Sequence, residues 1–125
     1  MVLPRSAGRA VPRRLNTRID YALPPDAPLL AVIDSLEQGG AERSLVDLIP
    51  HLRRLGVDVD VLTVRAPGLL ADEARAAGAE VHGLGAASRH LAVAGVRRAI
   101  RVGTPDLVHT TLYEANVVGR VAAAV

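Results

Sequence analysis

The chain has 125 residues and no cysteine, which allows one domain with a sizeable core and excludes disulfides and thiolate metal sites. Half of the residues are apolar, but the only aromatic residues are Tyr21 and Tyr113, so Leu, Val, Ile and Ala must build the core. Residues 1–28 carry a net charge of +3 and residues 29–125 one of −1, which argues against a basic nucleic-acid-binding face on the folded part.

Residues 1–28 form an Arg- and Pro-rich leader without a sustained apolar period. We predict that this leader is disordered or forms an extended arm on the surface, and that residues 29–125 form a single folded domain. The leader lacks the apolar stretch of a secretory signal, and the chain offers no run of about 20 apolar residues for a membrane span. We therefore expect a cytoplasmic protein; attraction of the arginines to anionic lipid would add peripheral contact at the inner face of a membrane.

From residue 29 onward, strand and helix patterns alternate. The apolar run 29–33 predicts a buried strand, and the polar, glycine-containing stretch 34–40 predicts a loop. A helix should begin near Ala41 and end before Gly56, with a kink or break near 47–50 because Pro50 removes one backbone hydrogen bond. Its buried stripe is expected to consist of Ala41, Leu45, Leu48, Ile49, Leu52 and Leu55.

The alternation continues to the end of the sequence. Strands are predicted at 57–64, 80–84 and 106–110, and helices at 69–77, at 89–102 with Ser88 as N-cap, and at 113–125. Four such alternations predict an α/β fold: a Rossmann-like, three-layer parallel sheet of at least four strands with helices on both faces. Ligands of such sheets bind beyond the carboxyl ends of the strands, which points to residues 34–40 and 109–116.

The loop at 34–40 leads directly into a helix, and its pair Gly39–Gly40 allows two interpretations. Free N–H groups and the helix dipole favour an anion such as a phosphate, which glycines let approach the backbone. Alternatively, the pair only eases a tight turn. The dinucleotide fingerprint and the Walker sequence are absent, and Gly83–Leu84–Gly85 stands where a phospho-receiver domain needs an acid.

Three stretches in register resemble the N-terminal domain of family-4 retaining glycosyltransferases of the GT-B fold. They are VIDSLEQGGAER at 32–43, LRRLGVDV at 52–59 and TPDLVHT at 104–110. The resemblance covers residues 29–125. It implies a bilobed enzyme that transfers a hexosyl or N-acetylhexosaminyl group from a nucleotide-sugar, such as a UDP-sugar, to a lipid-linked or polysaccharide acceptor.

The resemblance also implies roles for individual residues. Gly39 and Gly40 would bind the donor diphosphate through backbone N–H groups, and His109 would be a catalytic residue beside the transferred sugar. No cofactor and no metal are expected. The candidate acceptor-binding residues are Glu42, Arg43, Tyr113, Glu114 and Asn116.

Each of these side chains has a competing structural interpretation. Arg43 suits an ion pair on the helix surface, residues 113–116 suit helix entry and capping, and His109 suits a satisfied histidine at a strand end. His51, His82 and His90 show no metal-ligand spacing and are expected to be structural or exposed. The shape of the acceptor site should depend on the loops at 65–68 and 85–89.

Two departures from the family pattern limit this reading. Thr111 stands where many relatives carry a second histidine, and the sequence ends after the fourth predicted helix, without the C-terminal lobe that holds the donor. We therefore expect residues 1–125 alone to lack transferase activity and to need that lobe as a partner. Two alternatives remain open: a non-catalytic module that kept the fold, and an unrelated Rossmann-like nucleotide-binding domain.

Overall fold

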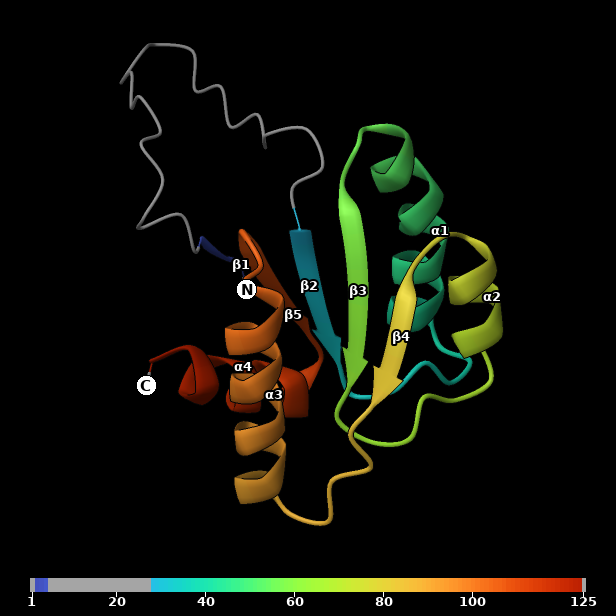
Figure 1. The fold of residues 1–125 in the computed structure, drawn as a ribbon. Helices are drawn as coiled ribbons and strands as arrows, with labels where there is room; N and C mark the ends of the chain where they lie inside the picture. The colour runs from blue at the N-terminus through green and yellow to red at the C-terminus, as the bar shows by residue number, and fades with distance from the viewer. Residues whose placement is uncertain (1, 5–27, 125) are drawn as a thin grey trace, which may run out of the picture.

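The computed structural model describes residues 2–4 and 28–124, which form one sheet in the order β1-β5-β2-β3-β4 (Figure 1). Four strands are mutually parallel, and only β1 runs antiparallel, along the outer edge of β5. The strands are β1 (Val2–Pro4), β2 (Pro28–Ile33), β3 (Asp58–Thr63), β4 (Glu80–Gly83) and β5 (Leu107–Thr111).

Four helices cover the sheet in two pairs. The helices are α1 (Gly40–Arg54), α2 (Ala71–Ala76), α3 (Arg89–Gly103) and α4 (Tyr113–Ala124). In Figure 1, α1 and α2 lie on one face and α3 and α4 on the other. The change of face follows from connectivity, because the chain leaves β4 at one side of the sheet and must cross β3 and β2 to reach β5. The predicted Rossmann-like α/β class is confirmed.

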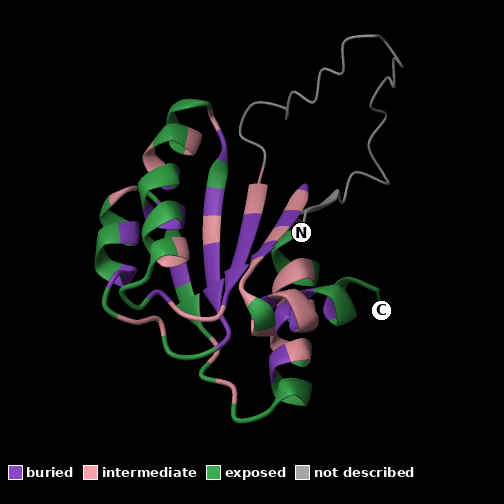
Figure 2. Cartoon of the chain, turned by 180° about the vertical axis from the view of Figure 1, so that it is seen from behind, coloured by how far each residue is buried: buried purple, intermediate pink, exposed green. Residues whose placement is uncertain are grey.

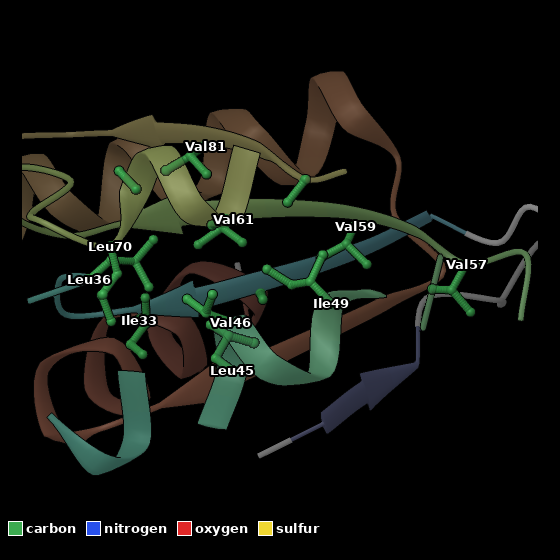
Figure 3. Packing of buried hydrophobic residues seen from close by; sticks show 14 residues of the cluster. Ile33, Leu36, Leu45, Val46, Ile49, Val57, Val59, Val61, Leu70 and Val81 are labelled. Atoms are coloured by element: carbon green, nitrogen blue, oxygen red, sulfur yellow. The ribbon is translucent and has the colours of Figure 1, made fainter. Parts of the chain in front are cut away.

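The two faces of the sheet bury two separate apolar clusters. Along β2, Ala31 and Ile33 join the cluster under α1 and α2, whereas Leu30 and Val32 join the cluster under α3 and α4. Figure 3 shows the first cluster, and in Figure 2 the buried residues concentrate on the strands while the outward faces of the helices are exposed. A strand that is covered on both faces requires a continuous apolar run, which explains why residues 29–33 are all apolar.

The predicted first helix has no break at Pro50, and two residues of its predicted buried stripe are exposed. The helix runs without a break from Gly40 to Arg54, through Pro50, and its buried positions are Leu45, Val46 and Ile49. Val46 and Ile49 before the proline and Leu52 after it pack in the cluster on this face of the sheet, so tertiary packing outweighs the single lost backbone bond. Leu48 and Leu55, which were expected in the stripe, are 48% and 76% exposed. The buried face is centred on Val46, and Leu55 comes after the last helical residue.

Strand β1 was not predicted from the sequence. Val2 pairs with His109 and Pro4 with Leu107, so the start of the chain borders the edge of the sheet. Three residues are too few for a recognisable alternation, and their partner strand lies about a hundred residues later in the sequence. The rest of the leader, 5–27, lies outside the described residues, and the domain boundary expected at 28/29 stays a prediction.

Candidate functional site

The carboxyl ends of the four parallel strands form one row at the lower edge of the sheet in Figure 1. Ile33 of β2 pairs with Thr63 of β3 and Thr111 of β5, and Thr63 pairs in turn with Gly83 of β4. The strand order reverses at β2, because β3 and β4 lie on one side of it and β5 on the other. The loops that follow β2 and β5 therefore lie where open α/β sheets bind their ligands.

The loop between β2 and α1 is fastened to the loop between β3 and α2. The Leu36 N–H donates to the Pro67 carbonyl (2.7 Å), the Leu70 N–H donates to the Leu36 carbonyl (2.8 Å), and the Leu36 side chain is fully buried. Gly68 makes this contact possible: its φ is +95°, and a Cβ there would lie 2.7 Å from the carbonyl carbon of Leu36. The loop before α1 is thus held by backbone contacts that a larger residue at 68 would break.

Gly39 and Gly40 are not required by the backbone conformation of this turn. Gly39 is the N-cap of α1 in an extended conformation (φ −155°, ψ 169°), and neither glycine has a positive φ. A Cβ on Gly40 would meet no atom within 4 Å, and one on Gly39 would meet only the flexible side chain of Glu42. The backbone conformation of the turn therefore does not by itself account for glycine at either position.

The start of α1 presents backbone N–H groups at the surface. The first helical hydrogen bond runs from the Arg43 N–H to the Gly39 carbonyl (2.9 Å), so the N–H groups of Gly40, Ala41 and Glu42 precede the helical ladder. No side chain of the described residues caps Gly39, and both glycines are exposed. This arrangement favours an anion.

Glu42 and Arg43 lie in the first turn of α1 but differ in their partners. The Glu42 carboxylate lies beside Gly39, the position from which a third helical residue can fold back on the N-cap. Arg43 forms ion pairs with Glu73 of α2 and with Asp47 (3.5 Å), and these hydrogen bonds raise the pKa of its guanidinium. The structure thus gives Arg43 the surface ion pair that competes with a role in acceptor binding.

The start of α4 has internal partners for its polar groups. Asp34, directly after β2, accepts a hydrogen bond from the Ala115 N–H through Oδ1 (2.7 Å). A residue at the end of the neighbouring strand thus caps α4, which follows β5. Leu112, before the helix, has a φ of +74°. Asn116 accepts a hydrogen bond from the Thr110 hydroxyl (2.6 Å), which turns its side-chain oxygen toward β5.

Tyr113 and Glu114 contact the first residue of α3. Arg89 donates to Glu114 through both Nε (3.1 Å) and Nη2 (2.9 Å), and its guanidinium lies 5.8 Å from the centre of the Tyr113 ring. The hydrogen bonds from Arg89 hold the pKa of Glu114 below its usual range. Tyr113 is 68% exposed, so of these two candidates its ring is the one left accessible to a ligand.

His109 was expected at the end of its strand, but it lies in the middle of β5. It pairs with Ala31 of β2, and alternation places its side chain on the face covered by α1, opposite Val108 and Thr110. Burial lowers its pKa, which favours the neutral imidazole near pH 7. Among the described residues, no hydrogen bond joins its ring to Gly39, Gly40 or the start of α4.

One groove of the described residues lies away from all of these side chains. Its volume is about 500 Å³, and it runs between α3 and the uncovered face of β3 and β4, where Asp60, Glu80 and His82 line it. Burial, and then the charge of Glu80, raise the pKa of Asp60. Within 2–4 and 28–124, no three His, Cys, Asp or Glu side chains gather in a way that could hold a metal ion.

The family of this chain follows from comparison with known protein families. The sequence profile of the glycosyl transferase 4-like domain matches residues 39–125. The chain belongs to the glycosyltransferase 4-like family. Searches of curated proteins and of solved structures give no significant match. Membership of a glycosyltransferase family implies binding of a sugar donor and an acceptor in general.

Two residues at the edge of this glycosyltransferase domain were not recognised from the sequence. Asp34 and Arg89 connect the loops after β2, β4 and β5, but their partners are 81 and 25 positions away. A carboxylate directly after the central strand is a signal that could have suggested the cap at Asp34. Nothing in the sequence indicated the partner of Arg89.

Proposed function

We propose that this chain is the N-terminal lobe of a glycosyltransferase that uses a nucleotide-sugar, with the donor diphosphate at Gly39 and Gly40. The observation that carries the proposal is the glycine pair itself, which stands where the backbone does not require glycine. Close approach of a phosphate to the backbone is a physical reason for glycine that remains. The family match and the strand reversal beside this loop support the same assignment.

In the proposed reaction, the bond between the sugar C1 and the diphosphate oxygen breaks, the acceptor hydroxyl oxygen bonds to C1, and the hydroxyl proton passes to an oxygen of the departing diphosphate. Negative charge grows on the departing diphosphate. The N–H groups at the start of α1 are fixed in direction before the reaction, so they stabilise this charge without reorganising. The lowered pKa of His109 keeps its ring neutral, which suits a hydrogen bond to a hydroxyl of the transferred sugar.

The acceptor is proposed to be a lipid-linked sugar or a polysaccharide that contacts the starts of α1 and α4. Tyr113 offers an exposed ring, and Glu42 offers a partly buried first-turn carboxylate without an ion pair among the described side chains. Arg43, Glu114 and Asn116 would contact the acceptor only by giving up or sharing the internal partners described above. We rank Tyr113 and Glu42 ahead of these three.

The remaining features of the proposal concern the wider protein. The donor is a UDP-sugar, transfer of a hexosyl or N-acetylhexosaminyl group retains the anomeric configuration, and neither a cofactor nor a metal takes part. A C-terminal lobe completes the cleft in this proposal, and transfer requires both lobes. No helix within the described residues has the length and hydropathy to cross a membrane. The proposed location is cytoplasmic, with peripheral membrane contact through the leader.

A calorimetric titration with UDP-glucose and with NAD tests the assignment. We expect weak but saturable binding of UDP-glucose, because residues 1–125 supply only the proposed diphosphate contacts, and we expect no binding of NAD. Gly40→Ala should weaken UDP-glucose binding about tenfold, because the added methyl group occupies the path of the phosphate. Binding of NAD without any response to UDP-glucose would contradict the proposal and favour an unrelated nucleotide-binding domain. Ala94→Gly, on α3, is the control: it exchanges alanine and glycine away from the loop and should leave UDP-glucose binding unchanged.

A further inference from the structure

A second, smaller pocket opens at the carboxyl edge, on the α3 and α4 side of the sheet. Its volume is about 160 Å³, room for roughly five water molecules, and Arg65, Ser88, Arg89 and Glu114 supply its polar lining. Val64 and Ala92 form an apolar floor. The pocket thus gathers residues from the end of β3 and from the starts of α3 and α4.

The charges around this pocket do not cancel. Both carboxylate oxygens of Glu114 accept hydrogen bonds from Arg89, which leaves Arg65 as the second guanidinium. Arg65 influences Glu114 only through its charge, and among the described residues no carboxylate lies within ion-pair distance of it. Two guanidinium groups against one carboxylate give the lining a surplus of hydrogen-bond donors and a positive charge.

The backbone of Arg65 is held firmly in place. Its N–H donates to the Asp34 carbonyl (2.9 Å), and its carbonyl accepts from the Thr63 hydroxyl (2.8 Å) and from the Gly85 N–H (3.4 Å). These bonds tie the residue to the end of β2, to its own strand and to the loop before α3. A guanidinium that starts from a fixed backbone loses less entropy when it binds an anion.

We propose that this pocket binds an oxyanion, a phosphate or a carboxylate, carried by the sugar acceptor. The inference rests on the proposed function and narrows its acceptor to an anionic one. Guanidinium groups suit planar or tetrahedral oxyanions, to which they donate two hydrogen bonds at once. The hydroxyl of Ser88, whose oxygen accepts from the Leu91 N–H (3.3 Å), has its proton available as a further donor.

The position of the pocket separates it from the donor subsite. The start of α1 lies on the other face of the sheet, and the two places are joined through the Asp34 carbonyl, which begins the glycine loop and holds Arg65. A donor diphosphate at Gly39 and Gly40 and an acceptor oxyanion at Arg65 therefore occupy separate places and can be bound at the same time.

Nuclear magnetic resonance of the full chain tests the inference with four probes: glucose 6-phosphate, glucuronate, glucose and inorganic phosphate. We expect glucose 6-phosphate, glucuronate or both to shift the Nε–Hε signals of Arg65 and Arg89 saturably, and glucose to leave them unchanged. Arg65→Gln should weaken binding at least about tenfold, because it removes a charge-assisted contact. Arg101→Gln, an exposed arginine on α3, is the matched control and should bind as the unsubstituted chain does.

Several results would overturn the inference. Equal affinity in Arg65→Gln would show that the shifts come from elsewhere, and equal binding of inorganic phosphate and glucose 6-phosphate would show a site for the free ion, not for an acceptor. UDP-glucose in the same spectra separates the two proposals through the Gly39 and Gly40 amides. If these amides respond and the arginines do not, only the anionic acceptor fails; if only the arginines respond, the donor site fails and the acceptor assignment fails with it.

Discussion

Two helices begin at the same edge of the sheet, α1 after β2 and α4 after β5, and their first turns differ in one respect. At α4, Asp34 accepts the Ala115 N–H and Arg89 binds both oxygens of Glu114. At α1, no side chain among the described residues caps Gly39, and Gly40 has open space where its side chain would be. The start of α4, with its polar groups bound by other residues, is the closed helix start. The start of α1, at Gly39 and Gly40, is the open helix start, whose N–H groups are available to a ligand.

This difference separates residues that hold the edge together from residues available to a ligand. An internal partner lowers the free energy of the folded state but leaves less capacity for a ligand, because every hydrogen bond to a ligand must first replace an existing one. The sequence motif alone ranks the starts of α1 and α4 together as candidate sites. The hydrogen bonds in the structure make the start of α1 the better candidate, because its N–H groups have no side-chain partner among the described residues.

The largest expected effect comes from detaching the loop that presents α1. Gly68→Ala should lower the free energy of unfolding by about 3 kcal/mol, because the new Cβ meets the carbonyl carbon of Leu36 at 2.7 Å in a left-handed conformation. Gly85→Ala is the control: its φ is +55° and its surroundings are open, so about 1 kcal/mol is expected. Urea denaturation measures both, and equal losses would show that the contact with Leu36 does not hold the loop.

Opening the closed helix start should have the next largest effect. Asp34→Ala removes the cap of α4 and leaves the Ala115 N–H without its partner, so a loss of about 1–2 kcal/mol is expected. Asp47→Ala, an exposed carboxylate on α1, should change the free energy of unfolding by less than about 0.5 kcal/mol. If Asp34→Ala proves as mild as Asp47→Ala in urea denaturation, α4 does not depend on this cap.

The open helix start should tolerate substitution without loss of stability. Gly40→Ala is expected to leave the free energy of unfolding unchanged or to raise it by up to about 1 kcal/mol, since alanine favours a helix and meets no neighbour. The same variant should bind UDP-glucose more weakly. Thermal unfolding and calorimetry on one preparation measure the two effects, and a destabilised variant would return Gly40 to a structural role.

The smallest expected effect concerns His109, which lies in the middle of β5. Burial lowers the pKa of its ring in the folded chain, so below about pH 6.5 the unfolded chain binds the proton more readily. The free energy of unfolding should therefore fall as the pH falls from 7 to 5, and His109→Gln should reduce this dependence. Urea denaturation at the two pH values measures it; an identical pH dependence in both proteins would contradict the burial.

The sequence predicts the architecture of this chain better than its site. Apolar runs and stripes such as 29–33 arise from burial, so periodicity reveals the strands and helices. The break expected at Pro50 was wrong because packing of Val46 and Ile49 on the sheet is a tertiary effect. Hydrogen bonds such as that from Ala115 to Asp34 cross 81 positions, and no local pattern encodes them. The glycine pair was visible in the sequence, but only its dihedral angles show that the turn does not need it.

The most direct test of the open helix start is a crystal structure of the chain with UDP-glucose bound. We predict diphosphate oxygens at hydrogen-bond distance, about 2.9 Å, from the backbone nitrogens of Gly39 or Gly40, with the Asp34–Ala115 and Arg89–Glu114 contacts intact. A diphosphate seated at the start of α3 or α4, with the two glycine nitrogens facing only solvent, would contradict it.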